Sequence, residues 1–356
     1  MLGPRLLAVL GLTAQCHAAS LNVMMNGLPG AMGVEIAQAC MRREGVSLVP
    51  YALTGPGCGG TVDVDGVTVK LYEPADRDEL AERVKTDYGS APAGSFVCVD
   101  FTHPSAVNGN AEWYAANALP FVMGTTGGDR DALLACVEDT PAAYAVIAPN
   151  MAKQIVALQA MLEQMASEFP GSFDGYSLSV VESHQSTKAD TSGTAKAVSA
   201  SLATLTNEGP AFVEPFDSIE RVRDTAEQLA GGGTSHRGVS PVPEGGLKGH
   251  AFHTYSLLSG DGNVEFQIRA PAPAQPPDAC AMSMRRASRR RTLRTLTVPV
   301  LVPRVPRLCR AGHNVVGRSV YAEGTVDAAV FLAGQVAAAA PKRLYDMVDV
   351  LKSGSM

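Results

Sequence analysis

Apolar residues near the start of the chain alternate between short runs and a longer amphipathic stretch. Leu21 to Met25 forms a short apolar run that predicts a β-strand, and a glycine-rich turn follows it. An amphipathic segment ending near Gly45 predicts a helix, and a second apolar run from Val46 to Leu53 predicts another strand. Strand, turn, helix and strand in this order indicate the beginning of a parallel α/β sheet.

The same alternation continues to about residue 150. The expected strands are residues 96–101, 121–124 and 144–148, and the expected helices are residues 106–117 and 129–138. We therefore expect a Rossmann-like, doubly wound parallel sheet over residues 21–150, which would form a dinucleotide-binding domain.

A second α+β domain with an open mixed sheet is expected over residues 151–318. Residues 150–168 have the apolar spacing of a helix and link the two domains. The later expected strands are residues 176–184, 249–258 and 263–267, and the later expected helices are residues 191–206, 328–340 and 344–351. Residues 319–356 are expected to return to the first domain.

Composition narrows the class of protein. The chain has 356 residues, of which 46% are hydrophobic and 18% charged, so it can bury the cores of two domains. A formal net charge of -6 argues against a general nucleic-acid binder. After the first twenty residues, no run approaches the roughly 18 apolar residues of a membrane span. The seven cysteines form no C-x-x-C pair, and we expect no metal site.

Residues 1–20 allow two interpretations. They contain one charge, Arg5, an apolar run from Leu6 to Leu12 and a small-residue end at Ala18 and Ala19. These features suit either a targeting leader or a short disordered tail.

The segment from Ile268 to Gly312 differs from the rest of the chain. It holds ten arginines, one acid (Asp278) and seven of the 23 prolines, with no period of a helix or strand. It is either a basic arm for an acidic partner or an insertion that does not belong to the native fold. We favour the insertion, because a strand ending at Gln267 would otherwise lead straight to His313.

The glycine-rich turn is a candidate dinucleotide site. Gly27, Gly30 and Gly33 lie between a predicted strand and a predicted helix, where the backbone can approach a pyrophosphate. The second strand ends in Ala52 to Gly55 without the carboxylate that binds the ribose of NAD, which favours NADPH. NADH remains an alternative, since no basic residue is evident there.

Two later loops also follow predicted strands. Asp100 to Pro104 and Gly124 to Gly127 are rich in small and hydroxylated residues, which suit contact with a ribose or nicotinamide. His103 lies in the first of these loops, and a structural hydrogen-bonding role is favoured for it over a catalytic one.

The segment ESHQSTKADTSGTA, residues 182–195, carries the candidate chemistry. His184 can donate a proton, Lys188 can neutralise an anion, and Ser192 to Thr194 precede a predicted helix whose N-terminus can bind a carboxylate. Together they suggest a small dicarboxylate substrate. The competing interpretation is an ordinary N-capped helix beside an exposed lysine.

Five motifs in order then resemble one family. NGLPGAMG, DFTHP, GTTG, APNMA and ESHQSTKADTSGTA are similar to the motifs of dihydrodipicolinate reductase, also called 4-hydroxy-tetrahydrodipicolinate reductase. The tail GRSVYAEGTVDAAVFLA also resembles the family. Gln185 after His184 looks like the plant and algal branch, as does GHAFH, residues 249–253. The block 268–312 has no counterpart in the family.

The resemblance implies roles for individual residues. His184 would be the general acid, and Lys188 would bind a substrate carboxylate and assist. The implied substrate-binding residues also include Gln185, Ser192, Gly193, Thr194 and Arg318. The implied cofactor-binding residues are Gly27, Gly30, Ala31, Met32, Gly33, Phe101, Thr102, Gly124, Thr125, Thr126, Gly127, Pro149, Asn150 and Met151.

The implied activity is NAD(P)H-dependent reduction of 4-hydroxy-tetrahydrodipicolinate in the diaminopimelate pathway of lysine biosynthesis. Residues 151–318 would serve substrate binding and oligomerisation, in a homotetramer or homodimer. If the chain belongs to the plant-like branch, the resemblance implies a plastid location. If it does not, a cytoplasmic location is expected.

Two alternatives stay open. One is another Rossmann dehydrogenase acting on a hydroxy or amino acid, which no second active-site pattern supports. The other is an inactive paralogue or a nicotinamide-sensing regulatory protein in which the Arg-rich block binds a partner.

Overall fold

The computed structural model describes residues 20–206, 218–232, 238–262, 264–269, 309–310 and 313–354. The suggested leader, apart from Ser20, and most of the block 268–312 lie outside these residues. The chain divides into two compact units. One contains the described residues up to Met151 and from Tyr321 onward, and the other runs from Ala152 to Val320.

A six-stranded sheet forms the centre of the first unit. Its order is β15-β8-β7-β6-β1-β2, and every neighbouring pair is parallel. The bounds are β1 Leu21–Asn26, β2 Val46–Leu48, β6 Phe96–Asp100, β7 Phe121–Met123, β8 Ala145–Ile147 and β15 Leu344–Tyr345. From β1 the chain builds β2 on one side and β6 on the other, so the order reverses between β1 and β6. In such sheets ligands bind at the carboxyl ends of the strands beside this reversal.

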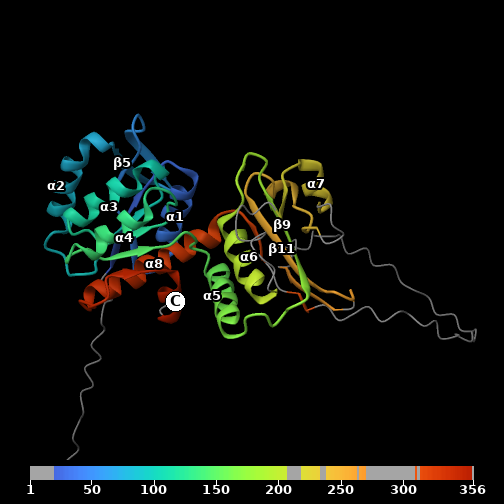
Figure 1. The fold of residues 1–356 in the computed structure, drawn as a ribbon. Coiled ribbons are helices and arrows are strands. Elements are labelled where there is room, and N and C mark those ends of the chain that lie inside the picture. Colours follow the sequence, from blue (N-terminus) through green and yellow to red (C-terminus); the bar gives the residue numbers. More distant parts are fainter. Residues whose placement is uncertain are drawn as a thin grey trace, which may run out of the picture. The chain divides into compact units, whose positions relative to one another are not determined.

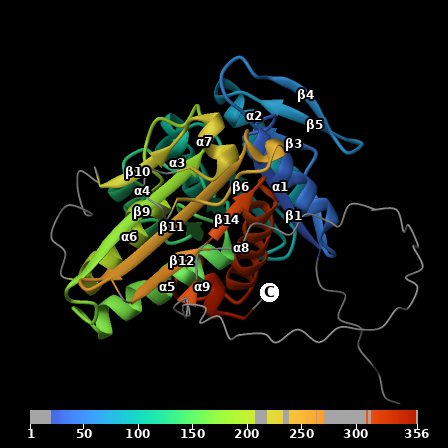
Figure 2. The same cartoon turned by 90° about the vertical axis from the view of Figure 1, so that its right-hand side faces the viewer.

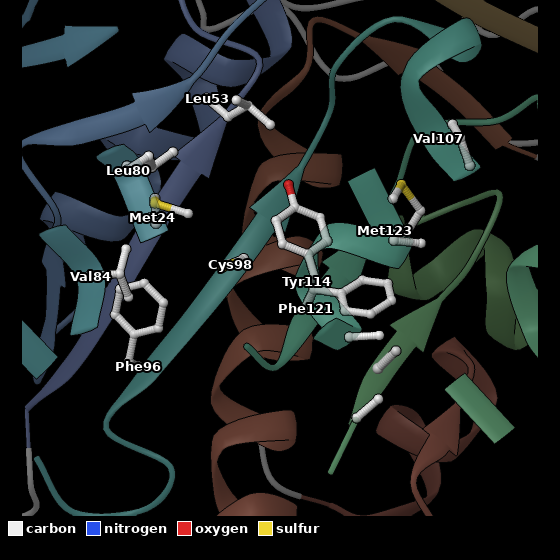
Figure 3. Close-up of a cluster of buried hydrophobic side chains, with 14 of the residues drawn as sticks. Met24, Leu53, Leu80, Val84, Phe96, Cys98, Val107, Tyr114, Phe121 and Met123 are labelled. Atoms are coloured by element: carbon white, nitrogen blue, oxygen red, sulfur yellow. The ribbon is translucent and has the colours of Figure 1, made fainter. Parts of the chain in front are cut away.

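Helices cover both faces of this sheet (Figure 1). Buried side chains of α2 (Arg77–Tyr88), α3 (Val107–Ala116) and α4 (Arg130–Glu138) share one core with the strands. Figure 3 shows part of it, where Tyr114 of α3 packs on Phe121 of β7 with ring centroids 5.1 Å apart. Ion pairs of Arg42 with Glu323 and of Arg43 with Asp327 join α1 (Ala31–Arg42) to α8 (Ser319–Ala337). The expected doubly wound fold of this unit is confirmed.

Residues 46–53 do not form the single strand that their apolar run predicted. Val46–Leu48 pairs with β1, but Tyr51–Leu53 is a separate strand, β3, that pairs with β5. Pro50 stands between them, and proline has no N–H to continue a ladder. The partners β4 (Gly60–Val64) and β5 (Val67–Tyr72) are a hairpin that we had not predicted, although Asp65 and Gly66 are typical turn residues.

Two expectations for the end of the chain were also wrong. The helix expected over residues 328–340 begins at Ser319, because the Ala- and Val-rich pattern continues backwards through residues that tolerate a helix. Residues 344–351 are not one helix. Leu344–Tyr345 pairs with β8, and α9 (Met347–Lys352) begins only after Asp346, whose side chain accepts hydrogen bonds from the N–H groups of Val348 and Asp349.

The second unit contains an open mixed sheet, as expected (Figure 2). Its order is β10-β9-β11-β12-β13, and β14 also pairs with β11. The bounds are β9 Tyr176–His184, β10 Ile219–Val222, β11 His250–Ser259, β12 Glu265–Arg269, β13 Cys309–Arg310 and β14 His313–Val316. Helices α5 (Lys153–Glu168) and α6 (Gly193–Thr206) pack on the face that bears Leu178 and Val180. Val181, Phe252 and other side chains form a smaller core on the opposite face.

Strands β12 and β14 continue one another along the same edge of β11. Arg269 pairs with Thr254, and His313 pairs with His253, the next residue of β11. Pairing runs without a gap or bulge from Leu258 to His250. Residues 270–312 therefore interrupt a strand whose register is otherwise continuous, and they fall inside the block that the sequence marked as a probable insertion.

This register predicts the effect of a deletion. A variant in which Arg269 is joined directly to His313 should have one strand of unbroken pairing over residues 265–269 and 313–316. The variant loses the two-residue strand β13, which pairs with β12. Closing a connection of 43 residues costs roughly 3 kcal/mol of chain entropy, so we expect the free energy of unfolding to rise by up to about that amount, less the contribution of β13. Denaturant unfolding of the variant and the full chain measures the difference.

A deletion that is one residue shorter is the matched control. Removing only residues 271–312 leaves one extra residue in the strand, which forces a bulge or turns the following side chains to the wrong face. Equal stability of the two deletion variants would show that the strand is not continuous across residues 269 and 313.

Candidate active site

One end of the second sheet gathers the polar side chains of that unit. Strands β9 and β10 end there at His184 and Val222, while β11 begins there at His250 and β14 ends at Val316. Residues 182 and 184 point to the same face of the sheet because strand side chains alternate. His253 lies directly opposite Glu182 on β11 and so shares that face. The ladder therefore brings together residues about 70 positions apart in sequence.

Glu182, His184 and His253 form a buried cluster. The Nε2 atoms of His184 and His253 are 3.0 Å apart, within hydrogen-bond distance. Oε2 of Glu182 lies 3.9 Å from the first nitrogen and 4.0 Å from the second. All three side chains are buried, and that of Glu182 has no exposed surface. Charged groups buried in this way need hydrogen-bonded partners.

Arg223 supplies the main partner of Glu182. Its guanidinium forms an ion pair with Oε1 of Glu182, and the backbone N–H of Ser192 donates to Oε2 at 2.9 Å. The same guanidinium donates to the carbonyl oxygens of Lys188 at 2.8 Å and of Asp190 at 3.2 Å. One arginine thus neutralises the buried carboxylate and holds the loop that carries Lys188.

A buried glutamine holds the end of strand β9. Gln228 lies in α7 (Thr225–Ala230), and its side-chain amide donates to the carbonyl oxygen of His184 at 2.7 Å and to that of Val222 at 3.3 Å. The ends of β9 and β10 are thereby held together beside the imidazole of His184.

His184 is neutral near pH 7 in this structure. Burial lowers the pKa of its imidazole to about 3, and the positive charges of Arg223 and Lys188 act in the same direction. A ligand that brings negative charge to Lys188 would oppose this effect, so the proton affinity of His184 depends on whether an anion is bound.

Lys188 is half-buried and paired with a carboxylate of its own loop. Its Nζ lies 2.6 Å from Oδ1 of Asp190, and this contact lowers the pKa of Asp190. Asp190 is exposed, so the pair is open to solvent. An incoming carboxylate can replace Asp190 on the lysine without uncovering a buried charge.

The helix start predicted beside Lys188 is present. Ser192 precedes α6, and its carbonyl oxygen accepts the first helical hydrogen bond, from Lys196 at 3.0 Å. Gly193 and Thr194 form the first turn, where backbone N–H groups carry partial positive charge. Gln185 turns the chain from β9 towards Lys188, whose N–H donates to the Gln185 carbonyl oxygen at 2.9 Å.

Arg318 lies at the same end of the sheet. It follows β14, and the N–H of Gly317 donates to the carbonyl oxygen of Gly249 at 2.8 Å, directly before β11. The structure therefore brings Arg318 to the sheet end that holds His184, within the second unit.

The buried cluster also has the composition of a possible metal site. The ligand atoms of Glu182, His184 and His253 all lie within 4.8 Å of one another. Both oxygens of Glu182 are already engaged by Arg223 and by the Ser192 N–H, and the two imidazoles face one another at hydrogen-bond distance. We therefore describe these residues as a hydrogen-bonded network.

In the first unit, the glycine turn has the shape that a pyrophosphate needs. Gly27 has a φ of +103°, and a Cβ there would lie 2.4 Å from the carbonyl oxygen of Phe101. A Cβ on Gly30 or Gly33 would lie 2.8 or 3.1 Å from the Gly27 carbonyl oxygen. Helix α1 begins directly after Gly30. Because glycine has no side chain, no capping side chain covers the N–H groups of the first turn. The open first turn, Ala31 to Gly33, fits a phosphate group.

The other predicted cofactor residues lie at the carboxyl ends of neighbouring strands. Phe101 and Thr102 follow β6, and Thr125 follows β7 and donates to the Thr102 carbonyl oxygen at 3.2 Å. Gly124 lets the Phe101 ring approach the backbone closely, because a Cβ at position 124 would lie 2.1 Å from that ring. Thr126 and Gly127 continue the loop after β7, and Pro149, Asn150 and Met151 follow β8. His103 caps a short helical turn through Ser105.

A buried polar network beneath these loops was missed by the sequence analysis. Oδ2 of Asp100 accepts hydrogen bonds from Tyr114 and Asn110, and Tyr114 also accepts one from Asn26. Asn26 in turn accepts from the N–H of Leu53. The sequence did contain a sign of this network, because a polar residue ends each of two apolar strands, Asn26 in β1 and Asp100 in β6.

Sequence reasoning also missed Arg223, Gln228 and His253. No local pattern marks the first two, which lie more than thirty residues after His184. His253 lies in the segment GHAFH, which we noted only as similar to the plant and algal branch of the family.

Comparisons with known proteins agree on one family. Residues 21–151 match the family model described as dihydrodipicolinate reductase, N-terminus. The chain is 39% identical over 337 residues to 4-hydroxy-tetrahydrodipicolinate reductase 2, chloroplastic, of Arabidopsis thaliana, covering 94% of this chain and 78% of the relative.

The chain belongs to the dihydrodipicolinate reductase family. A rice relative named probable 4-hydroxy-tetrahydrodipicolinate reductase 1, chloroplastic, is 39% identical over 95% of this chain and 80% of its own length. A dipicolinate-bound dihydrodipicolinate reductase from Paenisporosarcina sp. TG-14 shares the fold, with a TM-score of 0.51 at 18% identity over 92% of this chain and 97% of that one.

These findings confirm the resemblance drawn from the motifs, and they make the chain a pyridine-nucleotide-dependent reductase. Among the described residues, no helix of this reductase has the length and hydropathy needed to cross a bilayer.

Proposed function

We propose that this chain reduces 4-hydroxy-tetrahydrodipicolinate to tetrahydrodipicolinate with NADPH, in the diaminopimelate route to lysine. The observation that carries the proposal is the end of the second sheet, where a buried imidazole, a half-buried ammonium group and a helix N-terminus fall within residues 184–194. The names of the Arabidopsis and rice relatives support the same substrate.

The chain's own residues bind the substrate and supply a proton. Lys188 binds one carboxylate in place of Asp190, and Ser192, Gly193 and Thr194 bind the other at the start of α6, assisted by Gln185 and Arg318. The two negative charges offset Lys188 and Arg223, so His184 takes up a proton when the substrate is bound. The 4-hydroxyl group leaves as water, which gives the unsaturated ring that accepts hydride. His184 then protonates the neighbouring ring carbon that gains negative charge.

A bound reduced nicotinamide supplies the hydride for this reaction. Gly27, Gly30, Ala31, Met32 and Gly33 hold its pyrophosphate, while the loops after β6, β7 and β8 contact the ribose and nicotinamide. We propose NADPH as the preferred form, because Leu53, the last residue of β3, is followed by Thr54 and Gly55 without a carboxylate for the ribose of NAD. Thr54 donates to the Leu28 carbonyl oxygen at 2.6 Å and so lies beside the glycine turn.

A coupled assay tests this function. A dihydrodipicolinate synthase generates the unstable substrate in the cuvette, and consumption of NADPH and NADH by the full chain and by the 270–312 deletion variant is followed in parallel. We expect oxidation that depends on the synthase product and a higher kcat/KM with NADPH. If both chains bind NADPH and dipicolinate but neither oxidises the cofactor, the inactive or regulatory alternative is correct.

Location and assembly follow the family. We propose a plastid enzyme, with residues 1–20 as part of the leader, because the matched plant relatives are named chloroplastic. The homotetramer or homodimer implied by the motif resemblance is proposed as its assembly. Import of a fluorescent fusion and light scattering of the purified chain test these two points.

Replacing Lys188 with alanine should weaken substrate binding. Loss of a charge-assisted hydrogen bond to a carboxylate should raise KM by about tenfold or more, with a smaller change in KM for NADPH. Steady-state kinetics with each substrate varied in turn measures both. Lys85→Ala, which removes an exposed lysine of the first unit, should leave both KM values unchanged. An unchanged substrate KM in Lys188→Ala would remove Lys188 from the binding site.

A further inference from the structure

His253 has no role in the function proposed so far, yet it is almost completely buried within the site. Its side chain is 1% exposed. It projects from the middle of the sheet on the same face as His184, and its Nε2 directly faces that of His184 at 3.0 Å. The two rings have centroids 5.1 Å apart and are tilted by 57°, which is a hydrogen-bonding rather than a stacked arrangement.

The space between the two Nε2 atoms holds one hydrogen. If His184 is neutral, either ring can supply that hydrogen. If His184 is protonated, both of its ring nitrogens carry hydrogen, so its Nε2 must donate and the Nε2 of His253 must accept. His253 is then neutral and carries its own hydrogen on Nδ1. Protonating His184 therefore assigns a fixed role to His253.

The surrounding charges act on the protonated state of His184 in both directions. The carboxylate of Glu182 lies 3.9 Å from the imidazole of His184 and 4.0 Å from that of His253. Arg223, following β10, and Lys188, in the loop after β9, face His184 with positive charge. His250 and Tyr255 on β11 are further titratable neighbours. The charge of His250 lowers the pKa of His184, and a hydrogen bond to the backbone of His250 raises it. The hydrogen bond to His253 and the field of Glu182 thus oppose two cations.

We propose that His253 is a positioning residue that stabilises the protonated form of His184 by accepting a hydrogen bond from its Nε2–H. The inference rests on the proposed role of His184 as proton donor. It assigns to His253 control over the pH range in which the donor is charged, without contact between His253 and the substrate.

Variants of His253 separate this role from a structural one. His253→Phe fills the space but removes the acceptor, and it should lower kcat near pH 7 by about tenfold to a hundredfold, the range for a lost hydrogen bond to a charged group. The alkaline limb of kcat, where His184 loses its proton, should move to lower pH. His253→Gln, whose amide oxygen can accept, should restore most of both effects. KM for the substrate should change by less than about threefold in both variants, since Lys188 and α6 are unaltered.

A second histidine on the same strand provides the matched control. His250 is buried on the opposite face, where it contacts Ser183 Oγ at 2.9 Å and the Gly246 carbonyl oxygen at 3.2 Å. The charge of His250 lowers the pKa of His184, so His250→Gln should leave the alkaline limb in place or move it to higher pH, even where it lowers thermal stability. An equal shift in His250→Gln would show a general effect of disturbing the sheet, and would overturn the assignment to His253.

A direct titration of His184 tests the same role. NMR of ¹⁵N-histidine-labelled protein saturated with dipicolinate should show the His184 imidazole losing its proton at a lower pH in His253→Phe than in the parent chain. Loss of activity in His184→Gln together with an unmoved His184 titration in His253→Phe would refute the positioning role alone. Unchanged turnover in His184→Gln would instead refute the proposed function on which it rests.

Discussion

Replacing His184 with glutamine is expected to lower kcat by about two orders of magnitude or more, which is the usual scale for a lost general acid. Glutamine keeps the length and hydrogen-bonding capacity of the side chain but cannot supply a proton near pH 7. KM for the substrate should change little, because the carboxylates bind to Lys188 and to the start of α6. Steady-state kinetics under synthase-coupled conditions measures both parameters.

The same variant has a stability signature that shows the fold to be intact. The pKa of His184 is near 6.5 in an unfolded chain and about 3 in the folded protein, so between these values only the unfolded chain binds the proton. Acidification from pH 6.5 towards pH 3 therefore destabilises the parent chain through this group. His184→Gln should lose less stability over that range in denaturant unfolding. Full turnover by a folded His184→Gln variant would exclude the assignment of His184 as proton donor.

Replacing Arg223 with methionine should be the most destabilising single change at the site. It leaves the carboxylate of Glu182 buried without its cation, and breaking a buried ion pair in this way costs about 3–5 kcal/mol. It also frees the carbonyl oxygens of Lys188 and Asp190, so substrate binding should weaken as well. Urea unfolding monitored by circular dichroism gives the change in the free energy of unfolding.

A double variant distinguishes charge from packing. In Glu182→Gln with Arg223→Met the buried charge is absent, so much of the lost stability should return, because removing both partners costs far less than removing one. If the double variant is as unstable as Arg223→Met alone, the ion pair is not the source of the effect. Arg221→Met is the matched control, since Arg221 is exposed and donates only to the Ala189 carbonyl oxygen at 3.1 Å.

Helices and strands that follow an uninterrupted local pattern were predicted well. Those in which one residue interrupts the pattern were not. The alternating residues 176–184 predicted β9, and the helix-period residues 150–168 predicted α5, each within a few residues. The single strand predicted over residues 46–53 is divided at Pro50. The helix predicted over residues 344–351 is shorter, because Leu344–Tyr345 pairs with β8. A strand of two residues is stabilised by the sheet it joins, which its own sequence does not reveal.

The sequence by itself determined the dinucleotide turn, the segment 182–195 and the family, because glycine positions, a proton donor and a helix start are encoded within a few consecutive residues. Only the tertiary structure decided which distant side chains surround His184. Arg223, Gln228 and His253 reach His184 through strand pairing and helix packing across 39 to 69 positions, and no local pattern records such contacts. The register along β11 likewise decided where the basic block interrupts its strand, because pairing, unlike composition, assigns each residue a single partner.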